Sequence, residues 1–85
     1  MKKDNIEVQI FQIINKTLSK YKKKISKKDI KLRLYKDGVI DSLDYIRIIN
    51  DIEKEFKIKM KMETLDINFS VISIKKIINK EILKK

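Results

Sequence analysis

The sequence contains no cysteine, no histidine, no proline and a single glycine among its 85 residues. Without cysteine there is no disulfide framework and no thiolate metal site. Without histidine the chain lacks the commonest general base and the commonest metal ligand, so neither a hydrolytic triad nor a metal site is expected. No apolar run approaches the ~20 residues that span a bilayer, and no secretion signal is recognisable. We therefore expect a cytoplasmic protein without catalytic residues of its own.

The charged residues are unevenly distributed, although the formal net charge is +10. Residues 1–36 hold twelve Lys and Arg against three acidic residues, residues 37–55 hold two against six, and residues 56–85 hold eight against three. An acidic segment thus lies between two basic ones. The basic segments indicate either a nucleic-acid or anionic-surface partner or only the lysine- and isoleucine-rich composition typical of an AT-rich genome.

The length predicts one domain, residues 1–85, and the apolar spacing predicts helices. Residues 4–21 form the first expected helix, with Asp4 as N-cap and Glu7 completing a capping box. Residues 20–28 are expected to form a lysine-rich connector, in which Ser26 could cap a short turn. Residues 29–35 could form a short strand or an extended loop, and the loop is favoured because no clear second strand is available for pairing. The apolar stripe of the first helix is Ile6, Ile10, Ile13, Ile14 and Leu18.

The central helix is expected to run to residue 56 after a turn at Asp37-Gly38, with Asp41 or Ser42 as N-cap. Tyr45 and Ile48 lie beside the expected stripe, and we predict that they are partly exposed and offer a contact surface. That stripe is Leu43, Ile46, Ile49, Ile52 and Phe56.

Residues 57–62 are expected to be an extended connector, and residues 63–67 a short helical turn. Asn68 or Ser70 then caps a last helix, whose stripe is Val71, Ile74, Ile77 or Ile78, and Ile82. The predicted fold class is all-α: a small bundle of three main helices and one short helix, with a long loop between the first two main helices.

Three segments of this sequence resemble acyl carrier proteins. The phosphopantetheine attachment motif is similar to Asp37-Gly38-Val39-Ile40-Asp41-Ser42-Leu43-Asp44. The end of the family's acidic helix resembles Ile52-Glu53-Lys54-Glu55-Phe56-Lys57-Ile58. The corner before its last helix resembles residues 65–74. The likeness covers about residues 4–82 and implies an acyl-carrier-like bundle.

The resemblance implies that Ser42 carries 4′-phosphopantetheine, transferred from coenzyme A by a phosphopantetheinyl transferase. Acyl or aminoacyl groups would be held as thioesters on this arm for fatty-acid, polyketide, peptide or related biosynthesis. Asp41 would take part in recognition by the transferase, and Leu43 would belong to the attachment site. Further partners would be an acyl-loading or adenylating enzyme and a downstream synthase or transferase, and a monomer is expected. Ser42 acting only as a helix cap remains the plain alternative from local spacing.

The central helix departs from the family pattern in its charge. Arg47 and Lys54 stand where acidic residues are common, and Gly38 precedes Ser42 by four residues, as in D-alanyl carrier proteins and some stand-alone carriers. These features favour a dedicated set of partner enzymes. The expected partner face comprises Asp44, Tyr45, Ile46, Arg47, Ile48, Asp51, Glu53 and Lys54.

Two other functions stay open at this point. One is a basic helical module that binds nucleic acid or an anionic surface through its lysines, although no recognised binding motif is present and no nucleic acid is expected. The other is a degenerate carrier that acts only as an interaction module.

Overall fold

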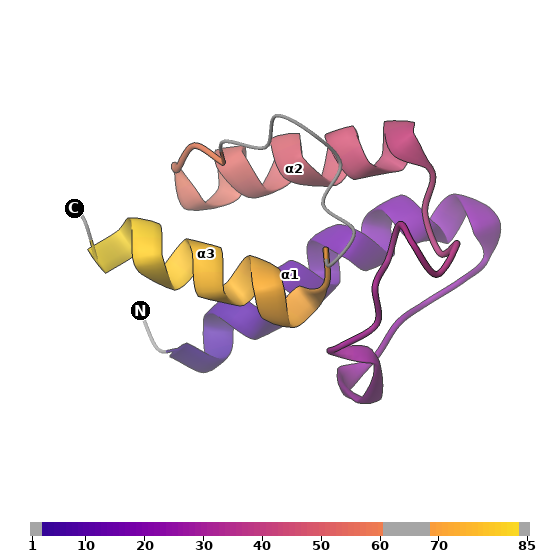
Figure 1. Cartoon of the computed structure of the whole chain (residues 1–85), viewed down its shortest axis with the longest axis horizontal. Helices are drawn as coiled ribbons and strands as arrows, with labels where there is room; N and C mark the ends of the chain where they lie inside the picture. Colours follow the sequence, from indigo (N-terminus) through magenta and orange to yellow (C-terminus); the bar gives the residue numbers. More distant parts are fainter. Residues whose placement is uncertain (1–2, 61–68, 84–85) are drawn as a thin grey trace.

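The computed structural model describes residues 3–60 and 69–83, with side chains described for residues 6–60 and 69–82 (Figure 1). Its elements in order are α1 (Lys3–Leu18), the 3-10 helices η1 (Ser19–Tyr21) and η2 (Lys27–Asp29), α2 (Ser42–Phe56) and α3 (Val71–Leu83). The described part of the chain contains no strand. The predicted all-α class, with three main helices and a long loop between the first two, is confirmed. The short helix expected at residues 63–67 lies outside the described residues.

Helix α1 is the centre of the bundle, because it packs against both α2 and α3. It runs in the opposite direction to α2 (Figure 1). Isoleucines supply most of the core, as expected from apolar residues repeating at i+3 and i+4. Fully buried members are Ile10, Ile14, Leu18, Leu34, Ile48, Ile52, Phe69, Val71, Ile74 and Ile78. In the described part of the chain, no helix is long and apolar enough to cross a membrane.

Helix α1 has the predicted apolar face but not the predicted N-cap. The helix begins at Lys3, so Asp4 lies inside it and the expected cap at Asp4 is wrong. Glu7 binds Lys75 instead, with 3.2 Å between the carboxylate Oε1 and the ammonium Nζ. This ion pair joins α1 to α3. The end of α1 tightens into η1, which stops at Lys22 in the left-handed region (φ 57°).

The long loop between α1 and α2 is mostly exposed, but hydrogen bonds hold it where Ile25 and Leu34 are buried, since buried backbone polar groups need partners. Asn15 on α1 accepts from the Ile25 N–H at 2.8 Å and donates to the Ile25 carbonyl at 3.0 Å. Farther along, the Leu34 N–H donates to the Phe69 carbonyl just before α3. Ser26 caps η2, as predicted, in a capping box with Asp29. The loop prediction for residues 29–35 is therefore confirmed.

The later helix boundaries also follow local chemistry. Lys57 ends α2 in the left-handed region (φ 54°), and the following connector buries Ile58 and Met60. Of the two expected caps of the last helix, Ser70 immediately precedes α3, whereas Asn68 lies outside the described residues. Ser70 and Ser73 exchange backbone N–H to hydroxyl hydrogen bonds of 2.9 and 3.3 Å, which satisfies N–H groups that the helix leaves unpaired.

Candidate functional site

A tight turn around Gly38 delivers the chain to the start of α2. Gly38 has φ +78°, a conformation that costs other L-residues about 1–2 kcal/mol. The Gly38 N–H donates to the Tyr35 carbonyl, and the Leu34 carbonyl accepts from both Val39 and Ile40. The predicted turn at Asp37-Gly38 is confirmed, and it places Ile40 in the core directly before the helix.

Asp41 is the N-cap of α2, which decides between the two expected caps. Its Oδ1 accepts from the Asp44 N–H at 2.8 Å, and its own N–H donates to Asp44 Oδ2 at 3.3 Å. Two N–H groups at the helix start are thereby satisfied in a reciprocal capping box. Ser42 is consequently the first residue of the helix, and its exposed side chain is not needed to cap it.

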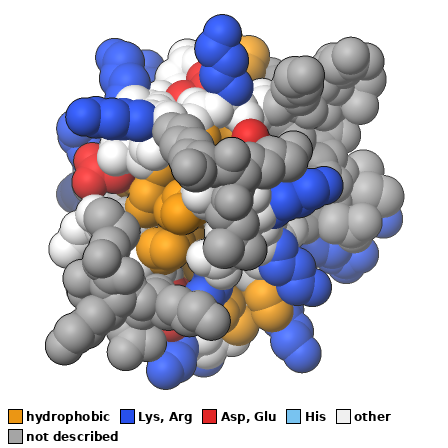
Figure 2. Space-filling model, turned by 90° about the vertical axis from the view of Figure 1, so that its left-hand side faces the viewer, with side chains coloured by type: hydrophobic (Ala, Val, Ile, Leu, Met, Phe, Trp, Pro, Cys, Tyr) orange, Lys and Arg blue, Asp and Glu red, His pale blue; other side chains and the backbone are white. Residues whose placement is uncertain are grey.

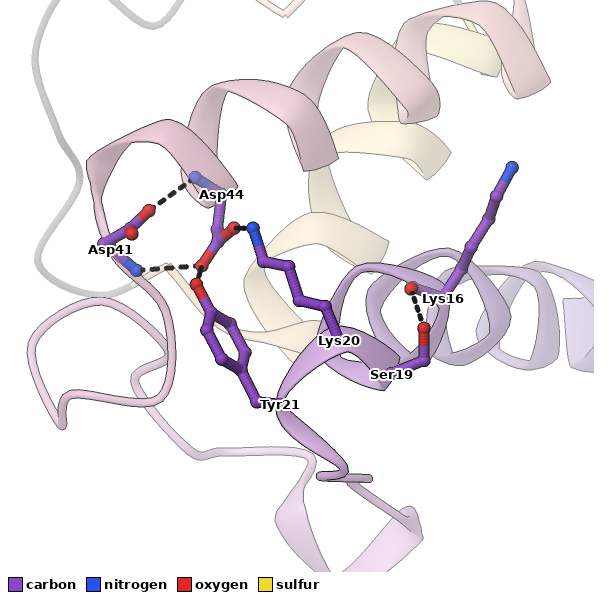
Figure 3. A network of polar contacts seen from close by, with 6 residues as sticks. All are labelled: Lys16, Ser19, Lys20, Tyr21, Asp41 and Asp44. Carbon is purple, nitrogen blue, oxygen red and sulfur yellow. Dashed lines mark hydrogen bonds and ion pairs between the residues drawn. The ribbon is translucent and has the colours of Figure 1, made fainter.

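The Asp44 side chain is held by two residues of η1, Lys20 and Tyr21 (Figure 3). Lys20 Nζ lies 2.6 Å from Asp44 Oδ1, and the Tyr21 hydroxyl donates to Asp44 Oδ2 at 2.8 Å. Only 1% of the Asp44 side chain is exposed. An exposed steering role on the partner face is therefore wrong for Asp44, because η1 covers it and pairs its charge.

These contacts shift the pKa values of Asp44, Lys20 and Tyr21. Burial by itself would raise the pKa of Asp44, but the hydrogen bonds from Lys20, Tyr21 and the Asp41 backbone outweigh it and leave the pKa below its usual value. Pairing with the Asp44 carboxylate raises the pKa of Lys20 and that of Tyr21. At neutral pH the three groups are thus an ionised carboxylate, an ammonium and a neutral phenol.

A shallow depression of about 200 Å³ adjoins the helix start. It is lined by Tyr21, Lys23 and Asp41 together with the turn residues Gly38, Val39 and Ile40. The carboxylates of Asp41 and Asp44 are therefore accompanied by two ammonium groups, those of Lys20 and Lys23. The helix start is close to electrically balanced before the favourable end of the helix dipole is counted.

The exposed and buried faces of α2 differ from the predicted stripe. Leu43 and Ile46, expected in the core, are 74% and 54% exposed, whereas Tyr45 and Ile48, expected to be partly exposed, are buried. Steps of three residues each fall about 60° short of a full turn. Leu43 and Ile52, nine residues apart, therefore lie on opposite sides of the helix. The buried face, apart from Asp44, is Tyr45, Ile48, Ile49, Ile52 and Phe56.

Aromatic packing fixes Tyr45 inside the core. The centroid of its ring lies 4.5 Å from the ring centroid of Phe69 and 6.5 Å from that of Tyr35, and both pairs have edge-to-face geometry. Such arrangements are the preferred ones for aromatic pairs. Phe69 precedes α3 and Tyr35 lies in the long loop, so only the tertiary structure brings these rings to α2.

The other residues expected on the partner face lie farther along α2. Arg47 and Lys54 are exposed, while Asp51 and Glu53 are half-buried. Glu53 Oε2 accepts from the Met60 N–H at 2.9 Å, which holds the connector after the helix. At about 1.5 Å per residue, Lys54 lies roughly 18 Å from Ser42 along the helix. Asp41, Ser42, Leu43 and Asp44 are thus together at the helix start, whereas Arg47, Asp51, Glu53 and Lys54 lie farther along α2.

Sequence reasoning missed Lys20, Tyr21 and Lys23 as part of this site. They belong to a lysine-rich run that local spacing describes as a solvated loop. No periodic signal connects Tyr21 with Asp44, which are 23 positions apart. Among the described residues, no group of three His, Cys, Asp or Glu residues is arranged to hold a metal ion.

Comparisons of the chain with protein-family models, with curated proteins and with solved structures found no match.

Proposed function

We propose that the protein is a carrier that holds acyl or aminoacyl groups as thioesters on a 4′-phosphopantetheine arm attached to Ser42. The observation that carries the proposal is the position of Ser42: exposed, after a glycine turn, and free of the capping role that Asp41 fills. The alternative that Ser42 serves only as a helix cap is weakened, because Asp41 is the N-cap of α2. The similarity of residues 37–44 to the carrier motif supplies the identity of the group.

The helix start fits a phosphodiester. N–H groups of the first helical turn and the helix dipole favour negative charge there by about 0.3–1 kcal/mol. Asp41 opposes the added charge, while the ammonium-bearing Lys23 lines the same adjoining depression. Asp44 adds little repulsion because Lys20 pairs with it.

The chain's own residues mount the arm and present it, and the arm supplies the chemistry through its thiol. A protein without cysteine and histidine can serve covalent transfer in this way. In the attachment, the Ser42 hydroxyl oxygen forms a new bond to phosphorus and the phosphoanhydride bond of coenzyme A breaks. Adenosine 3′,5′-bisphosphate is the leaving group, and the hydroxyl proton passes to a base of the transferase or to solvent. A separate transferase would catalyse this step, since the chain has no imidazole to activate Ser42.

Intact-mass measurement tests the proposal directly. The protein is incubated with coenzyme A and a broad-specificity phosphopantetheinyl transferase, alongside the variants Ser42→Ala and Ser26→Ala. We expect one phosphopantetheinyl group on the wild type and on Ser26→Ala, and none on Ser42→Ala. Ser26 is a matched control, because it is also an exposed serine at the start of a helical turn. Circular dichroism should show that the wild type and both serine variants are folded, since Asp41 still caps α2. Unmodified wild type with several transferases would refute attachment at Ser42.

The exposed lysines of residues 20–31 favour one second candidate, an anion-binding module. Such binding would weaken steeply with salt, by counterion release from nucleic acid. A gel shift with random duplex DNA at 50 and 200 mM salt separates the two functions, because the carrier requires no such affinity.

A further inference from the structure

The outward ridge of α2 carries apolar and basic side chains and no acidic one. Its residues are all exposed: Leu43, Ile46, Arg47, Asn50 and Lys54. At about 100° per residue these five positions fall within a sector of about 100°. Leu43 directly follows Ser42, so the ridge starts at the proposed attachment point.

The carboxylates of α2 lie outside this sector. Three of the four are bonded elsewhere, and Asp51 is half-buried beside the sector. Asp44 is buried under Lys20 and Tyr21. Glu53 accepts from the Met60 N–H, and Glu55 accepts from Gln9 Nε2 on α1 at 3.1 Å. Within this sector, the helix that contains most of the chain's acidic segment therefore presents apolar and positive side chains to solvent, while Glu55 is exposed outside it.

Further lysines lie near both ends of the ridge. A depression of about 330 Å³ beside its far end is lined by Asn50, Lys54, Ile58 and Lys59, together with the already bonded Glu53. Lys23 is exposed near its other end, in the same depression as Asp41. Figure 2, which views the end of the bundle where α2 ends, shows Lys and Arg side chains around the rim of that face, with a few Asp and Glu side chains among them.

We propose that this ridge docks partner enzymes whose carrier-binding face is acidic around an apolar pocket. Leu43 and Ile46 would fill the pocket, because large exposed apolar side chains beside a functional residue mark contact surfaces. Arg47 and Lys54 would face the partner's carboxylates, and this complementarity would set the association rate and the choice of partner. The inference rests on the proposed carrier function and adds the charge of the partners that the carrier meets.

Two versions of one phosphopantetheinyl transferase provide the probe. One has a basic carrier-binding face, and in the other the lysines and arginines of that face are replaced by glutamate. The rate of Ser42 modification, as kcat/KM from intact mass, is measured with both transferases for the wild type and for the double variant Arg47→Glu/Lys54→Glu. The control is Lys80→Glu together with Lys76→Glu, which changes the net charge equally at exposed positions of α3.

The wild type and the α3 control should prefer the acidic transferase. The double variant on α2 should shift the ratio of the two kcat/KM values toward the basic transferase by about tenfold or more, within the range of electrostatic steering. An unchanged ratio in the α2 variant, or an equal shift in the α3 control, overturns the inference while leaving attachment at Ser42 intact. No modification by either transferase overturns the proposed function, and this inference with it.

A last measurement distinguishes acidic protein partners from other anionic partners. The wild type is mixed with phosphatidylserine-containing vesicles and with random duplex DNA at 150 mM salt. Binding to either one that is abolished by Arg47→Glu/Lys54→Glu but not by the α3 changes would assign the ridge to that anion and overturn the protein-docking inference. Absence of such binding supports it.

Discussion

Lys20 Nζ lies 2.6 Å from Asp44 Oδ1, so η1, which follows α1, neutralises a buried carboxylate in the first turn of α2. The Tyr21 hydroxyl donates to the other oxygen of the same carboxylate. Asp44 also accepts from the Asp41 N–H in the capping box. The three contacts join η1, the N-cap and α2 next to Ser42, and they make Asp44 the most informative residue for tests of this site.

The Asp44→Asn variant should lose stability at neutral pH and lose part of the acid sensitivity of the fold. The pKa of Asp44 is lowered in the folded state, so its stabilising effect is present above the usual carboxyl pKa of about 3.9 and disappears as the pH falls through the folded-state value. We expect a loss of about 1–3 kcal/mol in the free energy of unfolding at pH 7. Urea denaturation between pH 3 and 7 measures it.

Asp37→Asn is the control for this experiment, because Asp37 pairs with Arg33 at the surface at 3.3 Å. An exposed pair of this kind contributes about 0–1 kcal/mol. If wild type and Asp44→Asn lose stability in parallel on acidification, the Asp44 carboxylate does not stabilise the fold through its charge.

Tyr21 should ionise at higher pH than an ordinary tyrosine, because its hydroxyl donates to the Asp44 carboxylate and this raises its pKa. Because the pKa of Tyr21 is raised in the folded state, its stabilising hydrogen bond should be present below pH 10 and should be lost as the phenol ionises. Ultraviolet absorbance of phenolate follows the titration of the three tyrosines. Tyr21→Phe should remove the late step, and Asp44→Asn should move it to lower pH. A late step that persists in Tyr21→Phe would belong to another tyrosine.

Gly38→Ala should destabilise the protein by about 1–2 kcal/mol through backbone strain alone. A Cβ at this position would meet no atom within 4 Å, and the φ of +78° is the only obstacle. Gly38→Asn should cost less, because asparagine tolerates the left-handed region better than alanine. Chemical denaturation of the three proteins measures the order. Equal stability of the alanine variant and the wild type would show that the turn relaxes out of this conformation.

The same substitution at two neighbouring isoleucines of α2 tests which face is buried. Ile48 is fully buried and Ile46 is 54% exposed. Ile48→Ala should lower the free energy of unfolding by about 2–5 kcal/mol, and Ile46→Ala by no more than about 0.5 kcal/mol. Thermal or urea unfolding distinguishes them. The reverse order would restore the face inferred from the sequence, with Ile46 inward.

Local chemistry predicted several features correctly because they depend on neighbouring residues. The glycine turn, the cap by Ser26, the choice of Asp41 or Ser42 at the start of α2, and the apolar face of α1 need only short-range contacts. The face of α2 was predicted wrongly at its first turns, because Leu43 and Ile46 continue an apparent stripe while drifting around the helix. Tyr45 was predicted to be partly exposed because no local pattern connects it with its ring partners Phe69 and Tyr35, which are distant in sequence.

The sequence by itself determined that the chain forms helices around an isoleucine core and that a serine follows a glycine turn at the start of one of them. Hydrophobic periodicity and capping chemistry are local, and a linear pattern records them. Only the tertiary structure decided that Asp41 leaves Ser42 unused as a cap, that Lys20 and Tyr21 bury Asp44, and that α2 turns apolar and basic side chains outward. These outcomes depend on how segments far apart in the chain pack together, and packing selects the face of each helix and the partner of each charge.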